Sequence, residues 1–194
     1  TDETNTIIKK YCKHNHRTKL ITNTEKKYAL KNIYDTLEDL DIDDNDIVVI
    51  LDGDDWLANK MVLQRLNDIY NKSDCWMTYG SYVEYPSNRR GKFSKKIPDR
   101  TINNSLYRES EWMSSHLRTF RYKLWKKINK QDFINPKTNN FIKAAWDLAF
   151  VFPMLEMSGK KALYVEDVLY IYNRENPLNE DKVDHSKQLN EESY

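Results

Sequence analysis

Three aspartates stand together directly after an apolar run in the first third of the chain. The run covers residues 47–51 (I-V-V-I-L), and Asp52, Asp54 and Asp55 follow it with Gly53 between them. Neighbouring carboxylates repel one another unless a cation lies between them, and their hard oxygens suit Mg²⁺ or Mn²⁺. Gly53 lets the backbone turn and leaves room for a ligand to approach. The pattern therefore predicts a site for a metal ion and a phosphate group.

Two other interpretations apply to the same aspartates. An acidic cluster after a strand is often a solvated turn or a helix N-terminus, where carboxylates interact favourably with the helix dipole. An apolar strand ending in D-x-D also opens the phosphatases of the haloacid-dehalogenase type, in which Asp52 would be the nucleophile. That pattern continues with Gly-Thr or Gly-Val, whereas Asp55 and Trp56 stand at these positions here. A phosphatase or phosphotransferase with Asp52 as nucleophile stays open as an alternative.

Composition limits the class of protein. The chain has 194 residues, enough for one α/β domain with a hydrophobic core. Its 31 Lys and Arg residues nearly cancel its 30 Asp and Glu residues, so no overall field favours nucleic acid or an anionic membrane. No apolar run approaches the length of a membrane span. Because Cys12 and Cys75 are too few for a disulfide framework, we expect reduced thiols, and we expect a cytoplasmic protein.

The elements that position the aspartates follow an α/β pattern. Apolar spacing predicts helices over 2–13 and 25–40, a strand over 18–22, and a helix over 59–71 that Asn59 caps. The uninterrupted run at 47–51 is typical of a strand buried on both faces of a parallel sheet. Ligands bind at the carboxyl ends of strands in such sheets, so the aspartates lie where a site is expected.

The second half of the chain predicts further strands and one strongly apolar helix. We expect a strand over 75–85, an exposed loop over 86–100 and an extended piece entering a helix over 114–128. A helix over 146–158 should end at Gly159, and two short strands should follow over 162–165 and 168–172.

In their order and spacing, four segments resemble the family 2 glycosyltransferases. They are the opening T-D-E-T-N-T-I-I-K-K-Y, the pair Lys31-Asn32, the stretch I-L-D-G-D-D-W-L, and W-D-L-A-F-V-F-P-M-L-E-M-S-G. The resemblance covers nearly the whole chain. It implies the A-type fold of nucleotide-diphospho-sugar transferases, which is α/β with a mixed, mainly parallel sheet and helices on both faces.

The resemblance also implies how the chain is organised. The family's first strand and the turn that cradles the uracil should precede Thr1, so we expect an N-terminally truncated piece of a longer protein. We expect residues 1–194 to form a single glycosyltransferase domain. Residues 1–72 should form its nucleotide-sugar and metal half, residues 73–175 its acceptor half and residues 176–194 a flexible tail.

The chemistry implied by the resemblance is transfer of a sugar from a nucleotide diphosphate, most simply a UDP-sugar. A divalent ion, Mn²⁺ or Mg²⁺, would neutralise the diphosphate leaving group. Asp54 would be the main metal ligand, Asp52 would contact the metal or the ribose, and Asp55 would support them. Asp147 would be the general base that takes the proton from the acceptor hydroxyl, so the reaction inverts configuration. Glu175, the distant His185 or a water would complete the metal ligands.

Other side chains would contact the two substrates. Lys31 and Arg174 are the expected donor-binding residues, since a guanidinium matches phosphate geometry. Trp146, His116 and Arg118 are the expected acceptor-binding residues. The acceptor hydroxyl could belong to a glycan, a protein side chain or a small molecule. A catalytically silent domain that binds carbohydrate or a partner is the alternative outside enzymes.

Overall fold

A computed structural model describes residues 3–177 and residue 179 of the chain. Its helices are α1 (Thr4–Cys12), α2 (Tyr28–Asp39), α3 (Val62–Lys72), α4 (Asp99–Asn103), α5 (Tyr122–Trp125) and α6 (Leu148–Ser158). Its strands are β1 (Ile47–Val49), β2 (Trp56–Leu57), β3 (Met77–Tyr85), β4 (Arg89–Arg90), β5 (Thr119–Arg121), β6 (Ile134–Asn135), β7 (Asn140–Phe141) and β8 (Ala162–Asn173). Short 3-10 helices span Lys130–Phe133 and Gly159–Lys161.

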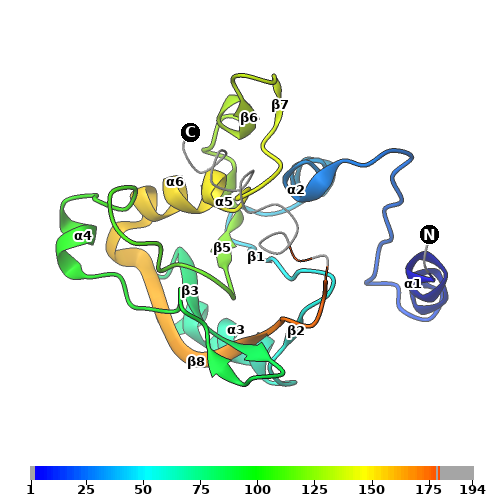
Figure 1. The fold of residues 1–194 in the computed structure, drawn as a ribbon, viewed down its shortest axis with the longest axis horizontal. Coiled ribbons are helices and arrows are strands. Elements are labelled where there is room, and N and C mark those ends of the chain that lie inside the picture. The colour runs from blue at the N-terminus through cyan, green and yellow to red at the C-terminus, as the bar shows by residue number, and fades with distance from the viewer. Residues whose placement is uncertain (1–2, 178, 180–194) are drawn as a thin grey trace.

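One mixed sheet organises the described chain (Figure 1), in the order β1-β5-β3-β8-β2 with β4 paired to β3. The longest pairing, between β3 and β8, is parallel, and the shorter pairings of β1, β2, β4 and β5 are antiparallel. The predicted α/β fold with a mixed sheet is therefore confirmed. A separate hairpin joins β6 and β7.

The two strands predicted over 162–165 and 168–172 are a single long strand in the structure. Opposite β3, Gly80 pairs with Val165 and Ser81 pairs with Val168, so Glu166 and Asp167 are extra residues in β8. The extra pair forms an irregularity in the ladder and leaves both acidic side chains exposed. A bulge therefore explains the polar interruption that suggested two strands.

Two other strand predictions are wrong in detail. Residues 18–22 form no strand, because a strand needs a neighbour for its backbone groups and the described chain places none beside this segment. The run at 47–51 forms only the short β1, which is half-buried and pairs antiparallel with β5 at the end of the sheet. Its apolar side chains lie at an edge of the described sheet rather than inside a parallel one.

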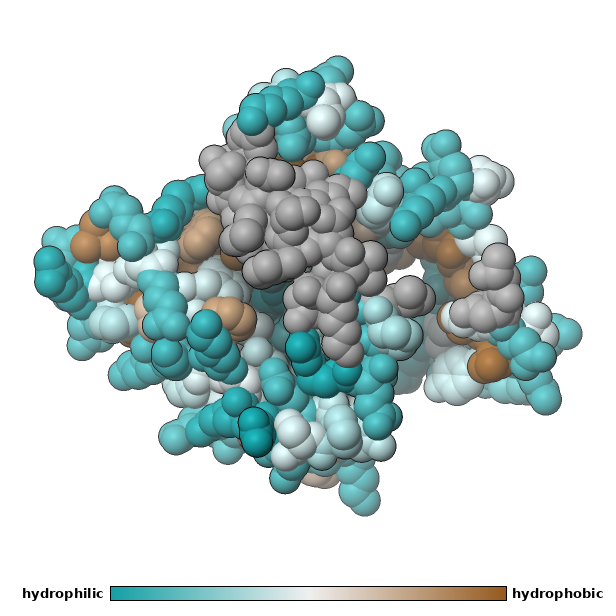
Figure 2. All heavy atoms as spheres, viewed as in Figure 1, coloured by the Kyte–Doolittle hydropathy of each residue, from teal (hydrophilic) through white to brown (hydrophobic). Residues whose placement is uncertain are grey.

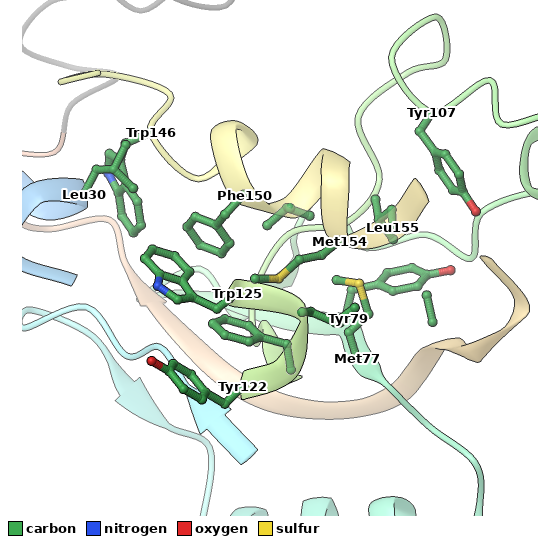
Figure 3. Packing of buried hydrophobic residues seen from close by; sticks show 14 of the residues in the cluster. Leu30, Met77, Tyr79, Tyr107, Tyr122, Trp125, Trp146, Phe150, Met154 and Leu155 are labelled. Carbon is green, nitrogen blue, oxygen red and sulfur yellow. The ribbon is translucent and has the colours of Figure 1, made fainter. Parts of the chain in front are cut away.

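Helices cover both faces of the sheet, as predicted. On one face α2, α5 and α6 pack against β3 and β5, and Figure 3 shows Trp125, Phe150 and Met154 between α6 and the sheet. α6 is apolar almost all round, which is typical of a fully buried helix. On the other face Val62 and Leu66 of α3 pack against β8.

Glycine has a defined role at two positions in these elements. Gly159 ends α6 with a φ of 51°, the left-handed conformation that glycine adopts without a steric penalty, which confirms the predicted helix end. At Gly80 of β3 an added Cβ would lie 2.4 Å from the carbonyl oxygen of Val165. The close approach of β3 and β8 therefore requires glycine there.

The helix α1 lies apart from the rest of the described chain, beyond an extended link (Figure 1). It buries none of its residues, and Ile7 and Tyr11 are 61% and 59% exposed. Figure 2 shows apolar surface at this end of the molecule. No helix within the described residues is both long and apolar enough to cross a membrane.

Candidate functional site at the D-G-D-D turn

The predicted acidic cluster lies in a pocket of about 520 Å³ at the end of β1. We call it the donor pocket after the role that the sequence predicts for it. Seven predicted site residues line it: Asp52, Asp54, Asp55, His116, Arg118, Trp146 and Asp147. The other lining residues are Ala29, Gly53, Ala145, Tyr172, Asn176 and Asn179. The structure therefore brings together residues from the start, middle and end of the described chain.

Pairing on both sides of the acidic turn fixes its place. Before the turn, the N–H of Ile50 donates to the carbonyl of Arg118 at 3.4 Å, continuing the pairing of β1 with β5. Within it, the N–H of Asp55 donates to the carbonyl of Asp52 at 3.2 Å. Directly after it, β2 pairs with β8. The turn therefore connects β1, which pairs with β5, to β2, which pairs with β8, and two of its acids contact β8.

Asp52 and Asp55 are held by β8. The hydroxyl of Tyr170 lies 2.6 Å from Oδ2 of Asp55 and 3.2 Å from Oδ2 of Asp52, and the N–H of Asn173 donates to Oδ1 of Asp55 at 2.7 Å. A tyrosine hydroxyl has one proton, so the shorter bond, to Asp55, is the better one. The two carboxylates therefore share one fully buried partner.

Burial changes the acidity of this pair. Removal from water raises the pKa of Asp52, and the charges of Asp147 and Asp54 add to the rise while Arg118 and Tyr170 oppose it. Burial likewise raises the pKa of Asp55, against the opposing bonds from Asn173 and Tyr170. A cation in the pocket would favour the ionised form of both groups.

Asp54 is the exposed member of the cluster, and Nδ2 of Asn176 donates to its Oδ2 at 2.5 Å. The acids of the donor pocket offer only hard oxygens, a donor set that fits Mg²⁺ or Mn²⁺. Among the residues that the structure describes, no three His, Cys, Asp or Glu side chains converge to hold a metal. The predicted third ligand Glu175 is exposed and lines no part of the donor pocket, and His185 lies outside the described residues.

Gly53 is not required by the backbone of the turn. It has no left-handed φ, and an added Cβ would meet no atom within 4 Å. The chain does turn at Gly53, but the turn does not require glycine, because other residues adopt this conformation too. The open space around Gly53 leaves the other interpretation, clearance for a ligand, as a prediction.

Asp147 stands just before α6, and Arg118 holds it. Nη1 of Arg118 donates to Oδ2 of Asp147, and Nη2 lies 3.0 Å from Nδ1 of His116. The Arg118 side chain is only 3% exposed, and its Nε has no hydrogen-bond partner among the described residues. A buried guanidinium paired in this way holds a carboxylate in one orientation.

His116 is neutral in this arrangement. Burial, with a smaller effect of the Arg118 charge, lowers the pKa of His116 well below 6.5. Because a guanidinium can only donate, Nδ1 of His116 accepts from it. The 4.0 Å separation between Nδ1 and Oδ2 of Asp52 is therefore not an ion pair. The ring stacks on Tyr170 with 4.5 Å between centroids and 9° between planes.

A second pocket of about 560 Å³ adjoins the donor pocket, and we call it the aromatic pocket. The two share His116, Ala145, Asp147 and Tyr172. Ala145, directly before Trp146 and Asp147, has a φ of 48°, which is uncommon for a residue with a side chain. Asp147 therefore lies on the boundary between two pockets of different chemistry.

Two predicted donor-binding residues lie away from the donor pocket. Arg174 lines the aromatic pocket, with its guanidinium 5.6 Å from the Tyr172 ring centroid. Lys31 lies on α2, where its ammonium group binds Asp35 and lines neither pocket. Both positions follow from packing, which the sequence does not reveal.

Most of the chain matches the profile of one known protein family. The profile of the family described as "Glycosyl transferase family 2" matches residues 1–145 of the 194 residues. The chain belongs to glycosyl transferase family 2. The matched region holds the acidic turn, His116 and Arg118, and it ends two residues before Asp147.

A solved structure shares the fold of this family 2 chain. It is the crystal structure of S. aureus TarS 1-349, with a TM-score of 0.57 and 21% sequence identity. The superposition covers 89% of this chain and 48% of that chain, so the family 2 chain spans about half the length of the TarS fragment. A search of curated proteins finds no match.

Several side chains at the site of this family 2 chain carry no sequence signal. Tyr170 sits in an ordinary strand pattern, and Asn176 and Asn179 fall in the segment predicted as a flexible tail. The residues of that segment that the structure describes include two that line the donor pocket. Asp54 and Asn176 are 122 residues apart in the sequence, so their hydrogen bond becomes apparent only in the folded chain.

Proposed function

We propose that the protein is a metal-dependent, inverting glycosyltransferase that moves a sugar from a nucleotide diphosphate, most simply a UDP-sugar, to a hydroxyl acceptor. One observation carries the proposal: Asp147 stands between a pocket lined by three further aspartates and a separate aromatic pocket. A donor bound on the acidic side and an acceptor on the other would meet at a carboxylate.

The donor pocket supports binding of a diphosphate through a divalent ion, which would neutralise the negative charge of the leaving group. Asp54 and Asp52 would hold this ion, and Asp55 would keep Asp52 in place through the shared hydroxyl of Tyr170. Asn176, which donates to Asp54, would orient that carboxylate. Oxygens of the diphosphate and water would complete the coordination.

Asp147 would act as the general base. Its Oδ2 is occupied by Arg118, so Oδ1 is the oxygen that would take the proton from the acceptor hydroxyl. The hydroxyl oxygen would then attack the anomeric carbon from the side opposite the diphosphate, which inverts the configuration. Trp146 and His116 line the donor pocket close to this point and would shape the space around the sugar.

Family membership favours this transferase over the phosphatase alternative with Asp52 as nucleophile. The silent binding domain predicts that Asp147→Asn leaves function untouched, because no base is needed. The transferase predicts that the same change abolishes turnover and preserves donor binding. Measuring turnover and donor binding of Asp147→Asn therefore distinguishes the transferase from the silent binding domain.

Calorimetric titration of UDP tests the donor pocket directly. With Mn²⁺ we expect saturable binding to the wild type, and we expect loss of binding with a chelator or in Asp54→Asn. Asp39→Asn is the matched control, because Asp39 is an exposed aspartate at the end of α2 that lines neither pocket and is bonded to Lys19. Equal UDP affinity in all four samples would contradict the proposed metal site.

A further inference from the structure

The aromatic pocket differs from the donor pocket in its lining. Its walls are Tyr82, Glu84, Lys92, Phe93, Arg108, Trp112, Ser115, His116, Ala145, Asp147, Leu148, Phe152, Tyr172 and Arg174. Five of these side chains are Tyr, Phe or Trp, whereas among the described residues the donor pocket has two of these types in its lining, Trp146 and Tyr172. The volume of about 560 Å³ lies within the usual range for small-molecule pockets.

The aromatic walls come from separate elements that the fold brings together. Trp112, from the loop before β5, meets Phe152 of α6 edge to face, with 5.3 Å between ring centroids and 74° between planes. Tyr82 of β3 meets Tyr172 of β8 at 6.0 Å and 69°. An edge-to-face contact does not stack the faces of the two rings on each other. Arg108 lies over the Phe152 ring at 5.4 Å and Arg174 over the Tyr172 ring at 5.6 Å, so Trp112 is the aromatic wall on which the proposal chiefly rests.

Polar groups are placed among these rings. Glu84, Ser115 and Arg174 line the same pocket and can exchange hydrogen bonds with hydroxyl groups. The guanidinium of Arg108 is bound by both carboxylate oxygens of Glu156, at 2.6 and 3.1 Å, so its charge is already balanced. The lining therefore combines ring faces with hydrogen-bonding groups and carries little unbalanced charge.

This combination selects among the possible acceptors. A lipid chain would remove water from the partly buried charged side chains Glu84 and Arg174, which is costly. A serine or threonine side chain is too small to use several aromatic walls. A pyranose ring has an apolar face of C–H groups and a rim of hydroxyls, and it matches both kinds of wall.

We propose that the aromatic pocket binds a sugar ring of the acceptor, so the acceptor is a glycan or a glycoside. This rests on the proposed function, because Asp147 is the group that joins the two pockets. In the transfer, a ring hydroxyl gives its proton to Asp147 and its oxygen bonds to the anomeric carbon. The bond from that carbon to the diphosphate oxygen breaks, and its electron pair stays on the diphosphate.

Saturation-transfer NMR with named probes tests the pocket without knowledge of the natural acceptor. The ring probes are the methyl pyranosides of glucose, galactose, mannose and N-acetylglucosamine, and the acyclic probes are sorbitol and N-acetylserine amide. We expect at least one pyranoside to bind and neither acyclic probe to do so. Trp112→Ala should weaken that binding by about tenfold or more.

The matched control is Trp76→Ala, since Trp76 lines neither pocket and its ring lies under Lys123 and Lys161. It should leave pyranoside binding unchanged. Circular dichroism checks folding, and if Trp112→Ala does not fold, Phe93→Ala removes another aromatic wall of the same pocket. Trp112→Phe should retain more of the binding than Trp112→Ala, because it keeps a ring.

UDP titration on the same samples separates the two proposals. UDP binding without binding of any pyranoside would overturn the acceptor inference and leave the donor site standing. Displacement of the pyranoside by saturating UDP would place the ring in the donor pocket and also overturn it. Failure of a chain extended upstream of Thr1 to bind UDP with Mn²⁺ would contradict the proposed function, whatever the pyranosides do.

Discussion

The hydroxyl of Tyr170 is the point on which two of the four pocket aspartates depend. It is fully buried and bonds to both Asp55 and Asp52. We expect Tyr170→Phe to lower the free energy of unfolding by about 1.5–3 kcal/mol, the usual contribution of a hydrogen bond to a charged group. The affinity for UDP with Mn²⁺ should fall as well, because the carboxylates lose their common partner. Urea unfolding and calorimetry measure the two effects.

At Tyr107, we expect the same Tyr→Phe substitution not to lower the free energy of unfolding. Its ring is buried, and its hydroxyl has no hydrogen-bond partner among the described residues. Tyr107→Phe should therefore leave the free energy of unfolding unchanged or raise it, because the change removes a buried polar group that nothing satisfies. Equal losses in Tyr107→Phe and Tyr170→Phe would show that the bonds to the aspartates are not what stabilises the site.

The ion pair between Arg118 and Asp147 predicts a coupled effect on turnover. Arg118→Gln should reduce kcat by about 100-fold or more, because Asp147 loses the group that orients it for proton transfer. Asp147→Asn alone should cost at least as much. If Arg118 acts through Asp147, the double variant Arg118→Gln/Asp147→Asn is no slower than Asp147→Asn. Independent, multiplying losses would argue for a separate role of Arg118.

At the scale of elements, the pairing of β3 with β8 depends on the missing side chain of Gly80. A Cβ there would lie 2.4 Å from the carbonyl oxygen of Val165, and neither backbone can yield without opening the parallel pair. We expect Gly80→Ala to lower the free energy of unfolding by about 1–3 kcal/mol.

Gly53→Ala should raise the free energy of unfolding by about 0.4–1 kcal/mol, because its Cβ meets nothing and the unfolded chain loses freedom.

The same two variants separate folding from binding. If the open space at Gly53 serves ligand approach, Gly53→Ala weakens UDP binding in a chain that is at least as stable as the wild type. Urea unfolding gives the free energy of unfolding of each variant, and UDP titration gives its affinity for UDP. Stability lost in Gly53→Ala as in Gly80→Ala would mean that the acidic turn tolerates no side chain at this position.

The elements also show what the sequence could predict and what it could not. The acidic turn and the approach to α6 were recognisable, because each is a local pattern whose residues fold next to one another. The strand expected over 18–22 has suitable side chains but no neighbour in the described sheet. Tyr170, Asn176 and Arg118 act through partners in distant segments, so their roles appear only when the sheet is assembled.

At the scale of the whole molecule, α1 is the part with least support from its surroundings. It buries no residue, and the link over 13–27 contains no helix or strand. We expect the first cuts of limited trypsin digestion at Lys13, Arg17 or Lys19, since opening this region costs little. Mass spectrometry identifies the cuts, and circular dichroism should show that the larger fragment stays folded.

The basic segment formed by β4 and the residues after it is the internal comparison for this experiment. It holds Arg89, Arg90 and Lys92, but Arg90 donates to Ser81 at 2.8 Å and the N–H of Gly91 donates to the carbonyl of Tyr82 at 2.9 Å. These bonds should delay cleavage there. First cuts in this segment would mean that α1 is better attached than its exposed surface indicates.

The contacts of the acidic turn with β8 also determine when the pocket can form during synthesis of the protein. Asp52 and Asp55 leave the ribosome more than 100 residues before the hydroxyl of Tyr170 and the backbone N–H of Asn173. Until β8 has emerged, the nascent chain exposes these carboxylates without the partners that hold them. The acidic pocket is therefore completed only after more than 100 further residues have been translated beyond its aspartates.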